Sequence, residues 1–359
     1  MDEVSLLENL LKLYSPTHQE SDAVKYLVEQ MNALGYTAHI DEMGNAIGVM
    51  GDGEKEVMML GHIDTVPGFI EVKREGDILH GRGAVDAKGP LATFVAAGAM
   101  AGNVAGRRLT VIGAVGEEGD SRGAHFLVKS RMKSARTSAG TAARTPHALI
   151  IGEPSAWDKI TLGYKGSAWF DFESRRALAH TSAQNESACE AAISFWNRLT
   201  SRGNQINEGK TKMFDQLLPT LRAMESSSDG FVESARFKFG LRLPPSITVS
   251  ELEKIVSDVA GNDSAKMVEG CEAYRAEKNT PLVRAFLSSI RASGGSPVFT
   301  MKSGTSDMNL VAPVWNCPTV AYGPGDSSLD HTPEEHILIS EYQRAVKILA
   351  SVLRDEKLV

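Results

Sequence analysis

A histidine and an aspartate follow an apolar run, one residue apart, in the segment MLGHIDTVPG. Residues 57–60 have the continuous apolar character of a buried strand, and Gly61 lets the chain turn at its end. At strand spacing, His62 and Asp64 point to the same side. This geometry suits an imidazole that does chemistry with one ring nitrogen while a carboxylate holds the other. A polar loop after a core strand is the alternative interpretation.

Carboxylates or a histidine also follow other apolar runs of the chain. They are Asp86 in GRGAVDAKGP, Glu117 and Glu118 in AVGEEG, Glu153 in IIGEPS, and His331 in GPGDSSLDHTPEE. In open α/β sheets, ligands bind in the crevice beyond the carboxyl ends of the strands. We therefore expect these side chains to line one cleft together with His62.

Like charges collected in one cleft are costly unless a cation neutralises them. Two histidines and three carboxylates suit zinc, which binds nitrogen and oxygen ligands and leaves a position open in catalytic sites. Two dications would outweigh the negative charges of Asp86, Glu118 and Glu153, and the surplus would favour a hydroxide nucleophile. Glu117 is then left to take a proton from water and pass it to a leaving amine. Two zinc ions are the predicted cofactors, and cobalt or manganese suits the same ligands.

Each of these residues also has a purely structural interpretation. Adjacent glutamates at the start of a helix favour the helix dipole. Asp86 could cap the helix that begins near Gly89, and His331 could be a surface histidine. The functional interpretation depends on the strand-end pattern taken as a whole.

Strands and helices alternate in the first part of the chain. Helices are expected at 4–14, 21–34 and 89–102, and buried strands within 37–50, 55–64, 107–118 and 146–155. Nearly continuous apolar strands between helices predict an α/β sheet covered on both faces. From about Tyr164 the expected order becomes βαββαβ, the split-βαβ or ferredoxin-like arrangement of a small separate domain. We therefore expect a catalytic metal-binding domain at 1–163 and 279–359, interrupted by an inserted domain at 164–278.

The composition limits the possible classes of function. The chain has 359 residues, 42% of them hydrophobic and 23% charged, with a net charge of −7, which argues against a nucleic-acid binder. Three widely spaced cysteines (Cys189, Cys271 and Cys317) rule out a cysteine zinc cluster. The N-terminal MDEVSLLENLLKLY predicts an amphipathic helix rather than a signal peptide, and no apolar run reaches membrane-spanning length. We expect a cytoplasmic protein.

One segment lacks any hydrophobic period. KSRMKSARTSAGTAARTP, residues 129–146, is rich in Ser, Ala, Thr and Arg and carries five positive charges. Such a composition predicts a flexible surface loop.

The motifs GHIDTVP, GRGAVDAKGP, GEEG, GEPS, SGTSD and YGPGDSSLDHTPEE occur in the order typical of the M20 metallopeptidase and deacylase family, which the chain resembles over nearly its whole length. The resemblance implies that one zinc is bound by His62, Asp86 and Glu153, and a second by Asp86, Glu118 and His331, with Asp86 bridging. It also implies that Glu117 is the general base and that Asp64 orients His62.

The same resemblance implies a zinc-peptidase α/β domain with an inserted lid that often mediates dimerisation. In the lid, His180 matches a histidine that stabilises the tetrahedral oxyanion, typically in the partner subunit's site. Arg242 lies where the family places an arginine that grips the substrate carboxylate. The family pattern also places Ser303, Gly304 and Thr305 of SGTSD along the same pocket.

Within the family, GRGAVDAKGPLA, GEPSAWDKITLGYKG and YGPGDSSLDHTPEE resemble hydrolases that release lysine or ornithine from an acidic amino-group carrier protein in lysine or arginine biosynthesis. The bond cut is the amide between the carrier's terminal glutamate side chain and the α-amino group. The basic segment 129–146 could help to dock such a carrier by charge attraction.

The alternatives are a deacetylase of acyl-ornithine or acyl-lysine, a succinyl-diaminopimelate desuccinylase, and a generic M20 dipeptidase or carboxypeptidase. A non-catalytic binding protein with the same fold is a different class, which the intact set of candidate residues, Glu117 included, argues against. A nucleotide-binding enzyme is excluded because the chain has neither GxGxxG before a helix nor a GKS or GKT ending.

Overall fold

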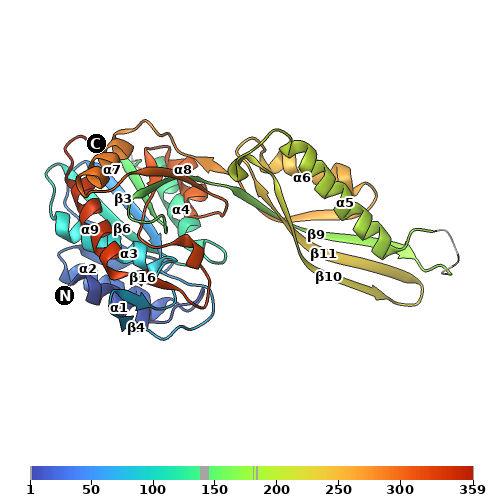
Figure 1. Cartoon of the computed structure of the whole chain (residues 1–359), viewed down its shortest axis with the longest axis horizontal. Coiled ribbons are helices and arrows are strands. Elements are labelled where there is room, and N and C mark those ends of the chain that lie inside the picture. The colour runs from blue at the N-terminus through green and yellow to red at the C-terminus, as the bar shows by residue number, and fades with distance from the viewer. Residues whose placement is uncertain (1, 138–144, 181, 183–184, 359) are drawn as a thin grey trace. The chain divides into compact units, whose positions relative to one another are not determined.

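The computed structural model describes residues 2–137, 145–180, 182 and 185–358. The chain divides into two compact units, and its elements are labelled in Figure 1. The first unit comprises residues 1–163, 276–300 and 306–359, and the second comprises 164–275 with 301–305. The second unit thus ends shortly before the expected limit at 278 and also includes the short segment 301–305.

The first unit is built around a mixed sheet with the strand order β1-β2-β6-β3-β7-β15-β8. Its strands are β1 (Thr37–Ile40), β2 (Ala46–Met50), β3 (Lys55–His62), β6 (Arg107–Ala114), β7 (Ala148–Gly152), β8 (Lys159–Tyr164) and β15 (Thr319–Ala321). The strands β6, β3, β7 and β15 run parallel to one another, and the others are antiparallel to their neighbours. The central strands are buried almost throughout, as their continuous apolar runs predict.

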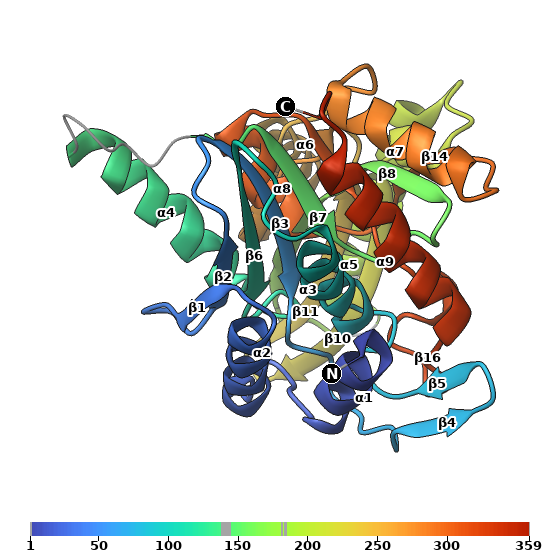
Figure 2. The same ribbon diagram turned by 90° about the vertical axis from the view of Figure 1, so that its left-hand side faces the viewer.

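Helices cover both faces of this sheet, as Figure 2 shows. They are α1 (Glu3–Lys12), α2 (Ser21–Ala33), α3 (Lys88–Ala101), α4 (Arg122–Thr137), α7 (Pro281–Ala292), α8 (Asp307–Trp315) and α9 (Ile339–Arg354). Helix α3 packs on β3, β6 and β7 and against α1 and α9, whereas α4 packs on α8, which contacts β7. Close packing of α3 is possible because Gly152 of β7 has no side chain, since a Cβ there would lie only 2.9 Å from the ring of Phe94. The α/β fold class predicted for this part of the chain is confirmed.

The short strands β4 (Lys73–Glu75), β5 (Ile78–His80) and β16 (His336–Leu338) form a small separate sheet, and β14 (Val298–Lys302) lies at the boundary of the two units. In the part of the chain that the structure describes, no helix is both long and apolar enough to cross a membrane.

The second unit has the element order β9, α5, β10, β11, α6, β12. The bounds are β9 (Gly166–Ala177), α5 (Ala188–Asn207), β10 (Leu218–Ser228), β11 (Val232–Leu243), α6 (Val249–Ala260), β12 (Ser264–Cys271) and the short β13 (Tyr274–Arg275). The strands pair antiparallel in the order β10-β11-β9-β12. Phe172 lies opposite Phe237 in the β9–β11 register, and its ring stacks on those of Phe237 and of Phe195 of α5 in the core.

The prediction of a surface loop at 129–146 is wrong for its first half. Helix α4 continues to Thr137, anchored at its start by the buried Ala124 and Leu127 one turn apart. Lys, Arg, Met and Ala in KSRMKSART are good helix formers, and they continue a helix that packing has already begun. The predicted loop residues 138–144 lie outside the described residues.

Candidate metal centre

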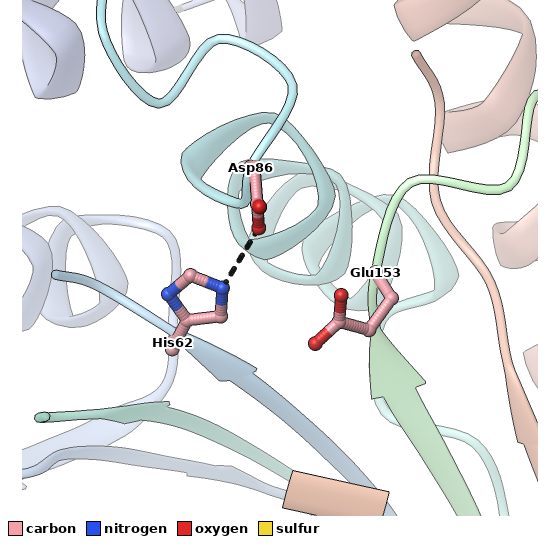
Figure 3. Close-up of side chains that lie close together, drawn as sticks. All are labelled: His62, Asp86 and Glu153. Atoms are coloured by element: carbon pink, nitrogen blue, oxygen red, sulfur yellow. Dashed lines mark hydrogen bonds and ion pairs between the residues drawn. The ribbon is translucent and has the colours of Figure 1, made fainter. Parts of the chain in front are cut away.

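Three side chains, two at strand ends and one in the loop before a helix, converge in the first unit (Figure 3). His62 is the last residue of β3, Asp86 precedes α3, and Glu153 follows β7. Each offers a ligand atom within 4.8 Å of the others, and His62 Nε2 lies 3.1 Å from Asp86 Oδ1. His62 and Glu153 are buried, with 2% and 8% of their surface exposed.

A second triplet shares Asp86 with the first. Asp86, Glu118 and His331 also bring ligand atoms within 4.8 Å of one another. His331 Nε2 lies 3.1 Å from Asp86 Oδ2 and 3.0 Å from Glu118 Oε1. The two oxygens of Asp86 therefore face different histidines, Oδ1 toward His62 and Oδ2 toward His331. A carboxylate placed in this way can bridge two cations.

The sheet explains why residues distant in sequence meet. Strands β3, β6 and β7 are parallel and in register, with His62 opposite Ala114 and Gly61 opposite Gly152. The residues that follow each strand therefore leave the sheet at the same edge. The structure brings together all of the sequence-predicted residues of this region, namely His62, Asp64, Asp86, Glu117, Glu118, Glu153 and His331.

Glu117 is close to the cluster but belongs to neither triplet. Its Oε2 lies 3.9 Å from His62 Nε2, and its side chain is 14% exposed. Burial raises the pKa of Glu117 well above its usual range, and the negative charges of Glu153 and Asp307 add to that effect. A carboxylate in this setting holds a proton more readily than one in water.

Asp64 anchors the site through several contacts. The ring nitrogen Nδ1 of His62 lies 3.0 Å from the backbone oxygen of Asp64 and 3.5 Å from the carboxylate oxygen Oδ1 of Asp64. The same carboxylate accepts hydrogen bonds from the backbone N–H groups of Glu117 and Glu118, at 3.0 and 3.1 Å. The hydroxyl of Thr17 donates to Asp64 Oδ2 at 2.7 Å. Asp64 thus fixes both the imidazole and the loop that carries the two glutamates.

The electrostatics of the cluster fit a bound cation. Burial raises the pKa of Glu153 well above its usual range, and that of Glu118 is raised for the same reason. Hydrogen bonds to Asp86 and Glu118 raise the pKa of His331 to about 10. Burial opposes ionisation of Asp86, yet the hydrogen bonds from His331 and His62 lower its pKa. Against the effect of burial, the neighbouring carboxylates likewise raise the pKa of His62, so the cluster favours positive charge at both imidazoles. Divalent ions would supply that charge, and the nitrogen and oxygen donors suit zinc.

The remaining predicted site residues lie in the second unit. His180 is exposed, and its Nδ1 lies 2.8 Å from the Ser182 hydroxyl. Arg242 donates from Nη1 to Thr305 Oγ1 at 3.2 Å. Ser303 and Gly304 precede Thr305 in the segment 301–305 that belongs to this unit.

Four residues of the site region were not singled out from the sequence: Thr17, Arg82, Asp307 and Glu335. Burial raises the pKa of Asp307 to about 7, and its Oδ1 has no hydrogen-bond partner among the described residues. Arg82, Asp307 and Glu335 stand within the GRG, SGTSD and HTPEE segments, so their motifs were visible although their roles were not.

Two imidazoles and several carboxylates gathered at the carboxyl edge of parallel strands, with one carboxylate shared by two triplets, define the class of dinuclear metal hydrolase sites. The chain belongs to the peptidase family M20/M25/M40, whose family model matches residues 58–355. It is a hydrolase of that family, and the prediction of the family from the ordered motifs is confirmed.

Curated relatives match over nearly the full length. The LysW-lysine hydrolase of Deinococcus radiodurans is 39% identical over 357 residues, which cover 97% of this chain and 95% of the relative. The LysW-lysine/LysW-ornithine hydrolase of Saccharolobus islandicus is 28% identical, covering 95% and 92%. Among solved structures, the M20 family metallo-carboxypeptidase Sso-CP2 from Sulfolobus solfataricus has a TM-score of 0.76 at 18% identity, covering 100% of both chains. At that level of sequence identity, the structural similarity shows that the two chains share a fold.

Proposed function

We propose that this protein is a zinc-dependent amidohydrolase that releases lysine, ornithine or both from an amino-group carrier protein of the LysW type. The observation that carries the proposal is Asp86, whose two oxygens lie 3.1 Å from His62 and 3.1 Å from His331 and so join two ligand triplets. The names of the full-length relatives support the substrate class. The bond cut would be the γ-glutamyl amide to the α-amino group of the released amino acid.

One zinc would be held by His62, Asp86 and Glu153, and the other by Asp86, Glu118 and His331. When bound, the two ions would polarise the amide carbonyl and lower the pKa of water. Cobalt suits the same nitrogen and oxygen donors and is a possible substitute.

The protein's own part in the chemistry is proton transfer by Glu117. Its carboxylate would accept a proton from the attacking water and deliver it to the amine nitrogen as the C–N bond breaks. The products are the carrier's free glutamate carboxylate and a free amino acid. Asp64 would keep Glu117 in place through the backbone hydrogen bond to its N–H.

We propose that the second unit is a ferredoxin-like lid that contributes substrate contacts and mediates a homodimer. Arg242 would bind a substrate carboxylate, with Ser303, Gly304 and Thr305 beside it. Burial, and with it the positive charge of Arg222, lowers the pKa of Arg242. Arginine stays protonated in proteins, so these two guanidinium groups would together favour an anionic substrate. His180 would donate to the oxyanion, from the partner subunit in a dimer.

A substrate panel with metal-reconstituted enzyme tests the proposal. LysW conjugates of lysine and ornithine would be compared with acetyl-lysine, acetyl-ornithine, succinyl-diaminopimelate and simple dipeptides. We expect kcat/KM for a carrier conjugate to exceed that for every small substrate. A preference for an acetylated or succinylated amino acid would overturn the carrier assignment and favour a deacylase, and cleavage of dipeptides alone would favour a general peptidase.

A further inference from the structure

A buried arginine and glutamate lie behind the metal centre, outside both ligand triplets. Arg82 Nη1 donates to Glu335 Oε2 at 2.8 Å. Arg82 is 7% exposed and Glu335 is fully buried. Two charges taken out of water carry a large desolvation penalty, and packed apolar side chains would provide stability more cheaply. The contacts that the pair makes indicate a more specific role.

Glu335 holds the backbone of the shared ligand. Its Oε1 accepts hydrogen bonds from the N–H groups of Val85 and Asp86, at 2.9 and 3.0 Å. These contacts fix the position from which the Asp86 side chain extends between the two histidines. They also link two loops that lie about 250 residues apart in the sequence.

Arg82 holds the loop that carries His331. Besides Glu335, its Nη1 donates to the backbone oxygen of Thr332 at 3.1 Å, and its Nε donates to that of Gly68 at 2.8 Å. Thr332 directly follows His331. Glu335 is therefore bonded to Asp86, a member of the second triplet. Arg82 is bonded to Thr332, the immediate neighbour of His331 in the same triplet.

His331 needs such support more than His62 does. The side chain of His331 is 50% exposed, and its φ of +63° lies in the left-handed region that is unfavourable for residues other than glycine. His62, by contrast, is held by the hydrogen bonds of the central strand β3 and is buried. The surroundings fix His62, whereas His331 depends on its loop.

We propose that Arg82 and Glu335 are positioning residues that set the separation of Asp86 and His331. They thereby determine the affinity of the metal position formed by Asp86, Glu118 and His331. This inference rests on the proposed two-metal function. Because Asp86 belongs to both triplets, the position formed with His62 and Glu153 is affected as well, but to a smaller extent.

The test is zinc binding by calorimetry and chelator competition, with the full chain and with three single variants. His331→Ala removes one ligand of the metal position formed by Asp86, Glu118 and His331, so the zinc-binding phase that it abolishes belongs to that position. Glu335→Gln and Arg82→Lys should weaken that phase by about 10- to 100-fold, the usual effect of losing a group that orients a ligand. The other phase should change by less than about tenfold.

A matched control separates positioning from general destabilisation. Asp263→Asn removes a charge from the ion pair between Arg176 and Asp263, 2.7 Å apart in the second unit. It should lower the Tm without changing zinc affinity. If Glu335→Gln or Arg82→Lys fails to fold, the double variant Arg82→Gln/Glu335→Gln removes both charges of the ion pair together, and it should weaken the same binding phase by a similar factor.

Folded Arg82 and Glu335 variants that bind both zinc ions with unchanged affinity would overturn the inference. An equal loss of zinc affinity at both metal positions would also overturn it, because Arg82 and Glu335 would then stabilise the whole site and not specifically the position that includes His331. Failure of the unsubstituted protein to bind a second zinc would instead overturn the two-metal function itself, so the two failures are distinguishable.

Discussion

The carboxylate of Asp64 accepts a hydrogen bond from the backbone N–H of Glu117 at 3.0 Å. The aspartate expected to orient His62 therefore also fixes the residue proposed as general base. It connects the end of β3 with the loop after β6, and the hydroxyl of Thr17 completes its hydrogen bonding. One side chain thus couples His62, a proposed metal ligand, to Glu117, the proposed proton carrier.

Asp64→Asn should impair both metal binding and turnover. The amide keeps only one acceptor oxygen, so it cannot accept from both the Glu117 and Glu118 N–H groups as the carboxylate does. We expect kcat/KM and zinc affinity each to fall by about 10- to 100-fold. Thr17→Val removes only one of the hydrogen bonds to Asp64 and should have a clearly smaller effect. Equal effects of the two variants would contradict the anchoring role.

Glu117→Gln should stop the chemistry and leave the metals in place. The amide cannot accept a proton, and loss of a general base costs about 100- to 10,000-fold in rate. Metal content measured by elemental analysis should remain at the level of the unsubstituted protein. Glu118→Gln is the neighbouring control, and it should lower the metal content because Glu118 belongs to the second triplet. Residual activity above a few per cent in Glu117→Gln would exclude its role as the base.

The metal-free protein should lose stability as the pH rises from about 5 to 7. Burial raises the folded-state pKa values of Glu117 and Glu153, and that of Asp307 to about 7. The folded chain then binds more protons than the unfolded chain in this range, so stability falls as pH rises. Zinc needs the deprotonated ligands, so its stabilising effect should grow with pH.

Thermal unfolding with a chelator and with excess zinc, at pH 5.5 and pH 7, checks this expectation. The difference in Tm between the two conditions should be larger at pH 7. A difference that is constant or that shrinks with pH would show that the buried carboxylates do not control the stability of the metal-free site.

Positive charge in the segment 129–146 should matter for the carrier substrate only. Replacing Arg131, Lys133, Arg136 and Arg144 together by glutamine should raise KM for the carrier conjugate, because charge attraction to an acidic partner is lost. KM for acetyl-lysine should stay unchanged, and raised salt should reduce the difference between the two proteins. An equal rise in KM for both substrates would exclude docking by this segment.

Much of the site was predictable because parallel strands impose a simple geometric rule. His62, Glu117, Glu118 and Glu153 each follow an apolar run, and strands of one parallel sheet end at a common edge. The sequence also indicated the α/β alternation and the change of element order near Tyr164. The helix that continues to Thr137 was missed, because its later part has no hydrophobic period and depends on the packing of its first turns.

By itself, the sequence determined the α/β alternation of the first part, the change of pattern near Tyr164, the family and the set of chemically capable side chains, because these depend on local periodicity and on motifs. Only the tertiary structure decided that Asp86 turns one oxygen toward each histidine. It alone decided that Arg82 and Glu335 tie the Asp86 and His331 loops together. The hydrogen bonds of Glu335 with Arg82 and Asp86 join residues about 250 positions apart, and a hydrogen bond over that separation depends on packing that no local pattern records.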